Sequence, residues 1–261
     1  MTSSANKSDW NPGAYERFRD LRLRPGLDML NAVGQMAAGD VVDLGCGNGQ
    51  MGPALKARSK GRQLVGVDAS PAMLTKARAA ASYDSLQQAD IREWHPRRAP
   101  GLIFSNAALH WVGEHEKLFP KLVAMLAKGG TLAVQMPHQN KAPSHRVWMS
   151  LVEELFPGRV EKMGTPGVMA PVKYEELLNP LGRFRLWETE YFQRLVAERG
   201  SHPVRRFTES TYARPVLAAC NAEEKAELIR RYEEVMHAAY PVRADGSVLF
   251  PFRRMFFTLT V

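Results

Sequence analysis

The chain has 261 residues, 45% of them hydrophobic and 24% charged, which suits one large α/β domain or a domain with a substantial insertion. A net charge of +8 suits an anionic partner, but the basic residues are scattered in pairs without interleaved aromatics, which disfavours nucleic acid. No apolar run approaches the ~18 residues of a membrane span, and residues 1–9 lack the apolar stretch of a signal peptide. The two cysteines provide neither a disulfide framework nor the spacing of a zinc site. We therefore expect a cytoplasmic protein without a metal.

The segment 1–30 precedes the first strand-like run and carries the spaced aromatic residues Trp10, Tyr15 and Phe18. This amphipathic pattern is typical either of a packed helix or of a lid that closes over a ligand and expels water. We predict an N-terminal lid or helical segment over 1–30, followed by the main domain over 31–261.

A strand that breaks into a glycine loop is the most informative feature, because 41–49 reads VVDLGCGNG. Glycines at 45, 47 and 49 permit a sharp turn and a close approach of the backbone to a ligand. The next strand-like run, 64–67, ends in Asp68, whose carboxylate can accept hydrogen bonds from both hydroxyls of a ribose. These residues predict a site for a ribose-bearing cofactor, although a glycine triplet alone also occurs in plain strand-to-helix turns.

The spacing of the loop separates the candidate cofactors. A dinucleotide fingerprint needs a third small residue where Gln50 stands, and a phosphate-binding P-loop needs a Gly-Lys-Ser or Gly-Lys-Thr that does not follow. Asp43, just before the loop, would repel a pyrophosphate but attract an amine or a sulfonium. S-adenosylmethionine carries both cations and no phosphate, so it is favoured over a nicotinamide cofactor.

Strand-like runs recur at 41–44, 64–67, 102–105 and 131–136, with helix-like segments between them. This alternation predicts an α/β fold with a doubly wound, mostly parallel sheet. Ser70 before Pro71 provides an N-cap and a first helical position, so 71–81 is predicted to be a helix that begins at the ligand edge. Met73 in this helix faces either the adenosine region or the core.

Beyond Pro137 the pattern changes, and a helical insertion is predicted before the last strand. Helical stretches near 144–156 and 173–181 precede a strand-like 183–192, mainly helical sequence over 203–240 and a final strand-like run at 248–260. Asn221, followed by Glu223 and Glu224, predicts the capped start of a long helix that reaches Ala239. We place helical substrate-side segments at about 138–182 and 193–245.

Short motifs spread over nearly the whole chain match a known family: SDWNP at 8–12, Tyr15, RP at 24–25, DLGCG at 43–47, DASPAM at 68–73, ADIR at 89–92, NAALHW at 106–111, LAVQMP at 132–137, RP at 214–215, YP at 240–241, Gly246 and FP at 250–251. On these residues the chain resembles the class I S-adenosylmethionine-dependent methyltransferases, and within them the family that methylates trans-aconitate. The likeness is looser over 138–172 and 193–213, and His110 stands where the family often has glutamine.

The resemblance implies a Rossmann-like fold, S-adenosyl-L-methionine as cofactor and S-adenosyl-L-homocysteine as product. It implies an O-methyltransferase that methyl-esterifies a carboxylate of a small polycarboxylic acid such as trans-aconitate; the alternatives are a different small acceptor and, less favoured, RNA. By analogy, Asp43 and the loop hold the methionine end, Asp68 the ribose, Asp90 with the Ile91 amide the adenine, and Asn106 lies near the sulfur. Asp90 and Asn106 are also plausible as simple turn residues. The implied cofactor-binding residues are Asp43, Gly45, Gly47, Asp68, Ala69, Met73, Asp90, Ile91 and Asn106.

A carboxylate acceptor, with an unperturbed pKa of ~4, is ionised at neutral pH and needs no base. Alignment alone can lower the barrier by about 7–11 kcal/mol, so no catalytic residue is assigned. His110 is expected to donate a hydrogen bond to the substrate, and arginine forks to bind its carboxylates, although surface ion pairs are the alternative for each arginine. We predict a small anionic substrate, no nucleic acid, no membrane and a monomer. The substrate-binding candidates are Trp10, Tyr15, Arg24, His110, Trp111, Arg214 and Arg254, with Arg253 as the alternative to Arg254.

Overall fold

The structure, a computed structural model, describes residues 19–159, 167–197 and 200–261. Trp10, Tyr15 and Phe18 therefore lie outside the described residues, and the lid over 1–30 stays a prediction. The chain divides into two compact units. The first unit comprises Met1–Gln135, Met169–Leu186 and Phe257–Val261, and the second comprises Met136–Val168 and Trp187–Phe256.

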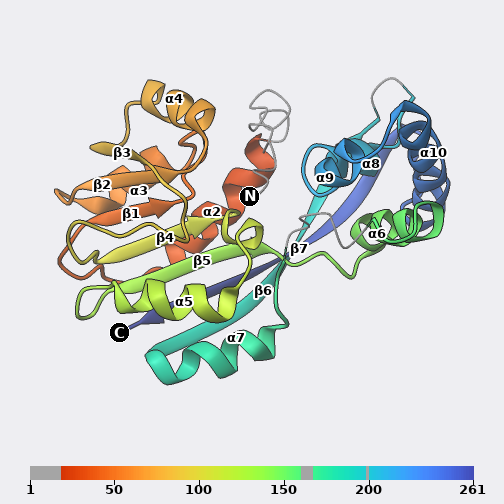
Figure 1. The fold of residues 1–261 in the computed structure, drawn as a ribbon. Helices are drawn as coiled ribbons and strands as arrows, with labels where there is room; N and C mark the ends of the chain where they lie inside the picture. The colour runs from red at the N-terminus through yellow and green to blue at the C-terminus, as the bar shows by residue number, and fades with distance from the viewer. Residues whose placement is uncertain (1–18, 160–166, 198–199) are drawn as a thin grey trace, which may run out of the picture. The chain divides into compact units, whose positions relative to one another are not determined.

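A seven-stranded sheet has the order β3-β2-β1-β4-β5-β7-β6 (Figure 1). The first five strands in this order pair in parallel. β7 runs antiparallel to β5, because Thr131 bonds Thr260 at one end while the His138 amide donates to the Arg253 carbonyl at the other. The prediction of a doubly wound, mostly parallel sheet is thus confirmed. The strands are β1 (Val41–Leu44), β2 (Leu64–Asp68), β3 (Ser85–Gln88), β4 (Leu102–Asn106), β5 (Thr131–Pro137), β6 (Arg183–Val196) and β7 (Ser247–Thr260).

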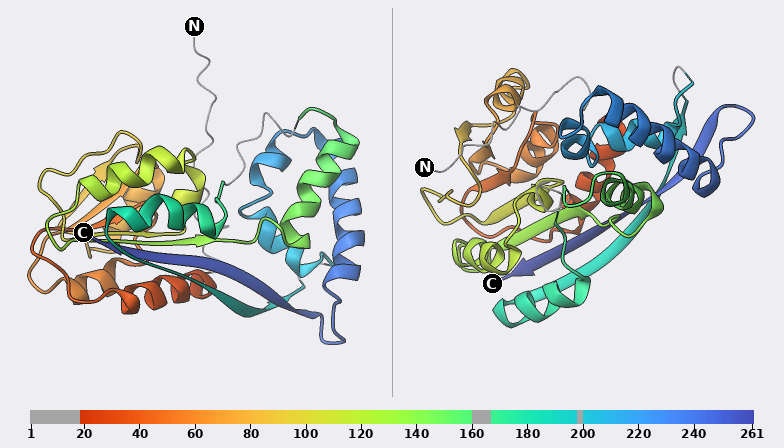
Figure 2. Two further views of the ribbon diagram at one scale, coloured as in Figure 1. Left: turned by 90° about the horizontal axis from the view of Figure 1, so that it is seen from below. Right: turned by 45° about the vertical axis from the view of Figure 1, so that its right-hand side comes forward.

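Helices cover both faces of the sheet in the first unit, with α2 and α3 on one face and α5 and α7 on the other (Figure 2). Burial on both faces explains why the central strands are continuous apolar runs in the sequence. Ser70 caps α4 as predicted, since its Oγ accepts the Met73 amide at 3.2 Å. These helices are α2 (Arg19–Ala32), α3 (Gly52–Ser59), α4 (Pro71–Ala79), α5 (His115–Ala124) and α7 (Pro171–Leu178), with short 3-10 turns η1 (Leu109–Trp111) and η3 (Asn179–Leu181).

The second unit contains the predicted helical insertion between the long neighbouring strands β6 and β7. The long helix predicted from Asn221 is confirmed, and it begins with a capping box in which Asn221 and Glu224 bond each other's backbone amides at 2.9 and 3.0 Å. Trp148 stacks on Tyr232 with ring centroids 3.8 Å apart and joins two of the helices. The helices between β6 and β7 are α8 (Pro203–Glu209), α9 (Arg214–Ala218) and α10 (Ala222–Ala239), and the unit also contains α6 (Pro143–Leu155), which precedes β6.

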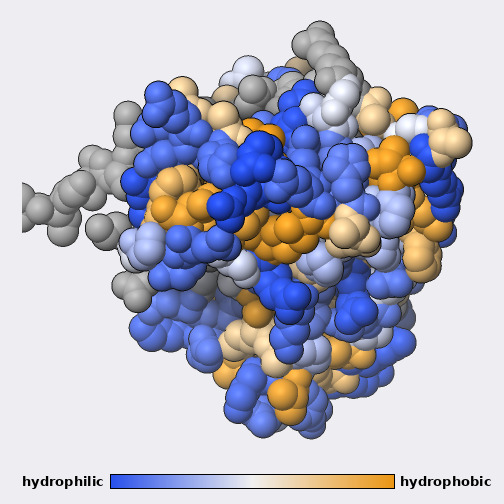
Figure 3. Space-filling model, turned by 90° about the vertical axis from the view of Figure 1, so that its right-hand side faces the viewer, coloured by the Kyte–Doolittle hydropathy of each residue, from blue (hydrophilic) through white to orange (hydrophobic). Residues whose placement is uncertain are grey.

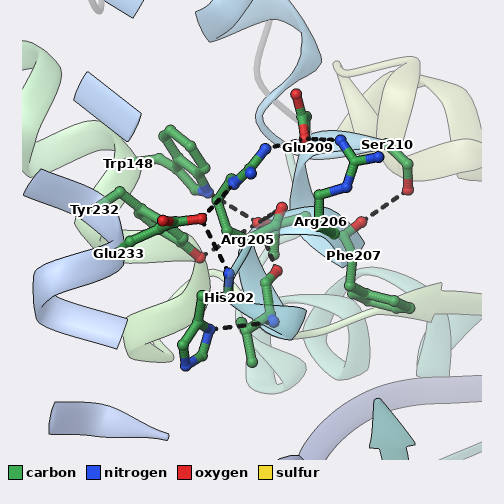
Figure 4. A network of polar contacts seen from close by, with 11 residues as sticks. Trp148, His202, Arg205, Arg206, Phe207, Glu209, Ser210, Tyr232 and Glu233 are labelled. Atoms are coloured by element: carbon green, nitrogen blue, oxygen red, sulfur yellow. Dashed lines mark hydrogen bonds and ion pairs between the residues drawn. The ribbon is translucent and has the colours of Figure 1, made fainter. Parts of the chain in front are cut away.

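A buried ion-pair network ties α8 to α10 in the second unit (Figure 4). The Arg205 guanidinium, 9% exposed, donates to Glu233 at 2.7 Å and to Glu209 at 2.6 Å. Glu233 also accepts the backbone amide of His202. Burial lowers the pKa of His202, whose Nδ1 accepts the Val204 amide and so caps α8 in its neutral form.

The adjacent basic residues seen in the sequence are largely engaged in ion pairs with acidic neighbours. On α10, Arg230 binds Glu227 and Glu234, while Arg231 binds Glu154 of α6 as well as Glu227. Hydrophilic residues predominate on the face drawn in Figure 3, with apolar residues between them. The described part of the chain holds no helix long and apolar enough to cross a membrane.

Candidate cofactor and substrate site

The strand order reverses between β1 and β4 in the first unit, and in doubly wound sheets the ligand crevice lies at the carboxyl ends of the strands at such a point. From β1 the chain continues to β2 and β3 on one side, whereas β4 and β5 lie on the other. Doubly wound sheets bind ligands where the strand order reverses in this way. The Ser105 hydroxyl donates to the Leu44 carbonyl at 2.8 Å and fixes the two strand ends together.

The glycine loop after β1 is held by the end of β2. The amides of Gly45 and Cys46 both donate to the Val67 carbonyl, at 2.8 and 2.9 Å. One carboxylate oxygen of Asp68 accepts the Gly47 amide at 2.8 Å, and the other accepts the Ser70 amide at 2.9 Å. Asp68 therefore shapes the loop, and lone pairs on the same two oxygens suit a pair of ligand hydroxyls.

The three loop glycines have positive φ angles but different surroundings. A Cβ on Gly45 would lie 2.3 Å from the Ala108 side chain, and one on Gly49 would crowd Ala77 and Tyr83. A Cβ on Gly47 would meet no atom within 4 Å. Gly45 and Gly49 are thus required for packing of the protein, and Gly47 is the glycine whose open side suits a close approach of a ligand.

Asp43 is a buried carboxyl group at the floor of the loop, only 2% exposed. The Tyr83 hydroxyl donates to its Oδ2 at 2.7 Å. Burial raises the pKa of Asp43 to about 7; the hydrogen bond from Tyr83 opposes this rise and the nearby charge of Asp68 adds to it. A cationic ligand would relieve this cost, because an opposite charge favours the ionised carboxylate.

Cys46 lies in the loop as a small buried side chain. Burial, followed by the charges of Asp43 and Asp68, raises the pKa of the Cys46 thiol far above its ordinary value. The thiolate is the reactive form of cysteine, so Cys46 is not a nucleophile at neutral pH.

Asn106 ends β4 and faces the middle of α2, the first helix of the described chain. A Cβ on Gly26 of α2 would lie 2.5 Å from the Met51 sulfur and 3.1 Å from the Asn106 Cγ, so this glycine lets α2 pack directly against the crevice. Among the described residues, the buried Asn106 Oδ1 and Gln50 Nε2 have no hydrogen-bond partner. Buried polar atoms normally have partners, so a polar ligand fits this position.

The remaining predicted cofactor residues follow β2 and β3. Asp90 begins a tight turn, since its carboxylate accepts the Arg92 amide at 2.9 Å and pairs with the Arg92 guanidinium at 2.5 Å. Ile91 is buried, and its Cδ1 lies 3.6 Å from a Cβ built on Gly45, so the turn reaches the glycine loop. Met73 is 5% exposed and Ala69 is exposed.

His110 and Trp111 lie in η1, which follows β4 at the same edge of the sheet. His110 is buried and Trp111 half-buried, with ring centroids 5.0 Å apart. Buried His115 bonds the Leu109 carbonyl at 2.9 Å through Nε2 and the Tyr174 hydroxyl at 2.6 Å through Nδ1. This pair anchors the turn that carries His110.

The predicted arginines do not gather with these residues within one unit. Arg24, in the first unit, has a side chain 76% exposed and forms a weak ion pair with Asp28 at 3.7 Å. Arg214 begins α9 in the second unit. Arg254 of β7, also in the second unit, is only 2% exposed and lies over the Phe252 ring at 4.7 Å, whereas its exposed neighbour Arg253 approaches Glu190 at 3.7 Å.

Sequence reasoning missed Tyr83, Gly26 and His115. Tyr83 precedes β3, whose polar sequence SLQQ gave no strand signal, so nothing placed its ring beneath Asp43. Gly26 follows Arg24-Pro25, one of the motifs of the family resemblance, but its contact with Asn106 depends on the packing of α2. Within the described ranges, no three His, Cys, Asp or Glu side chains gather in a way that could hold a metal ion.

Comparison with known sequences bears directly on this site. A family described as a methyltransferase domain matches residues 41–130, which contain the glycine loop, Asp68, Asp90 and Asn106. The chain is 38% identical to the trans-aconitate 2-methyltransferase of Paracidovorax citrulli over 95% of this chain and 96% of that protein. It is 36% identical to the Klebsiella pneumoniae enzyme of the same name, over 95% and 96% of the two chains.

Solved structures share the fold at low sequence identity. The YcgJ protein of Bacillus subtilis superposes with a TM-score of 0.58 at 13% identity, covering 90% of this chain and 96% of that one. Phosphoethanolamine N-methyltransferase 2 of Haemonchus contortus, solved with phosphomonomethylethanolamine and S-adenosylhomocysteine, superposes with a TM-score of 0.52 at 19% identity, covering 90% of this chain and 52% of that one.

Proposed function

Since the chain belongs to the trans-aconitate 2-methyltransferase family of S-adenosylmethionine-dependent enzymes, we propose that it transfers a methyl group to a carboxylate of trans-aconitate or a closely related small polycarboxylic acid. The observation that carries the proposal is identity of 35–38% to enzymes of that name across nearly the whole chain, the substrate half included. An acceptor of another small-molecule class is the alternative.

The crevice fits the cofactor because it offers a buried carboxyl group, an open glycine and a buried amide oxygen without a partner among the described residues. Asp43 suits the ammonium group, and the Gly45–Gly47 backbone suits the methionine end. Asp68 suits the ribose hydroxyls, with Ala69 and Met73 following it at the start of α4. Asp90 and the Ile91 amide are assigned to the adenine, and Asn106 to the methionyl side near the sulfur.

When bound, the cofactor supplies a methyl group on a cationic sulfur. A carboxylate acceptor is already ionised at neutral pH, so the protein's task is to bring the acceptor oxygen into line and exclude water. His110 is assigned as a hydrogen-bond donor that orients the acceptor, beside Trp111. Arg24, Arg214 and Arg254 are assigned to the substrate carboxylates, together with Trp10 and Tyr15 outside the described residues.

We also infer a small anionic substrate, no nucleic-acid or membrane partner, a monomer and a cytoplasmic location. The ion pairs formed by Arg205, Arg230 and Arg231 support this view, because they neutralise basic residues that would otherwise attract a polyanion. The free cysteines Cys46 and Cys220 agree with a reducing compartment.

Transfer of labelled methyl from S-adenosylmethionine should be detected with trans-aconitate and should be weaker with other di- and tricarboxylic acids. The measurement is radioactivity or mass in the ester product across a panel of acids, with a matched panel of neutral amides as the control. Binding of S-adenosylhomocysteine without labelling of any acid would contradict the carboxylate assignment while leaving the cofactor assignment intact.

His110→Gln should retain at least a third of kcat/KM for the acid, because the amide can still donate a hydrogen bond. His110→Ala should lose about tenfold, the typical effect of one hydrogen bond. The measurement is kcat/KM against pH for wild type and both variants. A loss above a hundredfold in His110→Gln, together with loss of the acidic limb of the pH profile, would indicate a general base instead.

A further inference from the structure

We propose that Tyr83 is a positioning residue for cofactor binding, whose hydroxyl holds the Asp43 carboxylate in the orientation that receives the ammonium group of the cofactor. The inference rests on the proposed role of Asp43 and adds to it a residue outside the glycine loop. Tyr83 lies in the connection between α4 and β3, forty positions from Asp43 in the sequence.

The contact between the two side chains is specific. The Tyr83 hydroxyl donates to Oδ2 of Asp43 at 2.7 Å, which leaves Oδ1 for another donor. Asp43 forms no ion pair with a cationic side chain of the described residues. A buried carboxylate is costly without a positive partner, so Tyr83 orients this group without neutralising it.

Three glycines form a socket for the Tyr83 ring, which we call the tyrosine socket: Gly49, Gly52 and Gly66. A Cβ on Gly66 of β2 would lie 2.9 Å from the ring, one on Gly52 of α3 would lie 3.0 Å from it, and one on Gly49 would lie 3.2 Å from it. Gly52 and Gly66 do not have positive φ angles, so backbone conformation does not explain them. Close packing explains them: a Cβ on Gly66 would crowd Leu86 as well as Tyr83, and a Cβ on Gly52 would crowd Ser82 as well as Tyr83.

The electrostatic surroundings give Tyr83 a measurable effect on binding. Asp43 is faced by Asp68 of β2, by the Cys46 thiol of the loop and by Tyr83, and burial raises its pKa to about 7. The hydrogen bond from Tyr83 lowers that pKa, so its loss leaves more Asp43 protonated at neutral pH. A protonated carboxyl group does not attract an ammonium group, so cofactor affinity should fall at and below neutral pH.

Tyr83→Phe should therefore weaken S-adenosylhomocysteine binding about tenfold at pH 7, the effect of one hydrogen bond to a charged group, with a smaller loss at higher pH. The midpoint of its affinity-versus-pH curve should move to higher pH. Titration calorimetry of wild type at pH 6, in two buffers of different ionisation enthalpy, should show release of a proton on binding, because the ammonium group lowers the pKa of Asp43.

Gly52→Ala provides a second variant, since it retains the phenol but crowds its ring and the adjacent Ser82 side chain, and it should also weaken binding. The variant that carries both Tyr83→Phe and Gly52→Ala should bind S-adenosylhomocysteine no more weakly than whichever of the two single variants binds it more weakly. Tyr232→Phe is the matched control: its hydroxyl donates to the Ser144 carbonyl in the second unit, so its loss should lower thermal stability and leave affinity unchanged.

Different results would overturn the proposed role of Asp43 and the proposed role of Tyr83. If Asp43→Asn binds S-adenosylhomocysteine as tightly as wild type, the proposed role of Asp43 is wrong. If Asp43→Asn weakens binding while Tyr83→Phe stays within twofold of wild type with an unchanged pH midpoint, only the role of Tyr83 is overturned. A drop in the melting temperature of Tyr83→Phe without a change in affinity would likewise assign Tyr83 to packing alone.

Discussion

Asp68→Asn should reduce affinity for S-adenosylhomocysteine at least a hundredfold, the largest effect expected in the crevice. The wild-type carboxylate accepts the amides of Gly47 and Ser70, one on each oxygen. An amide nitrogen in place of one oxygen cannot accept, so either the glycine loop or the start of α4 loses its partner. Two charged hydrogen bonds to the ribose would weaken as well, each worth about 1.5–3 kcal/mol.

Calorimetric titration with S-adenosylhomocysteine measures the affinity of Asp68→Asn, and circular dichroism checks that the variant is folded. Asp40→Asn is the matched control, because Asp40 is an aspartate of the same unit that pairs with the exposed Arg98. We expect that control to bind as wild type does. An Asp68→Asn variant within fivefold of wild-type affinity would contradict the assignment of Asp68 to the ribose.

Glu233→Gln should destabilise the protein by about 2–3 kcal/mol, the largest effect expected in the second unit. The substitution preserves the shape of the side chain but removes the charge that Arg205 meets at 2.7 Å, in a site where Arg205 is 9% exposed. The buried Arg205 guanidinium still carries the free-energy cost of its desolvation, but one of the two carboxylates that offset this cost is gone. Glu209 still contacts Arg205, so the loss falls below that of an isolated buried pair.

Urea denaturation followed by circular dichroism gives the free energy of unfolding for Glu233→Gln. The neighbouring Glu234→Gln is the matched control on the same helix, since Glu234 meets Arg230 on the exposed surface. Salt and water screen that pair, so no measurable change is expected. Equal effects of the two substitutions would show that burial of Arg205 does not govern the strength of the network.

Some elements of the fold could be predicted from the sequence and others could not. The central strands and the helices α4 and α10 were predictable because burial on both faces produces apolar runs, and because Ser70 and Asn221 carry the chemistry of helix caps. Strand β3 was missed because an edge strand exposed to water needs no apolar run. The helical substrate-side segments at about 138–182 and 193–245 and the lid over 1–30 stay predictions.

Some residues of the site could likewise be chosen from the sequence, whereas their contacts could not. Asp43, the glycine loop and Asp68 could be chosen from the sequence, because strand ends followed by glycine and acid are local patterns. The hydroxyl that Asp43 accepts from could not, because the Tyr83 ring comes from the segment before β3 and packs against glycines of two other segments, the loop that enters α3 and strand β2.

By itself, the sequence determined the fold class, the cofactor and the family, since each depends on residues close together in the chain or on likeness along its whole length. Only the tertiary structure decided which glycine stays open to a ligand, which hydroxyl orients Asp43, and which arginine is enclosed in the ion-pair network of the second unit. These properties depend on distances and burial between segments far apart in sequence, and no local pattern encodes them.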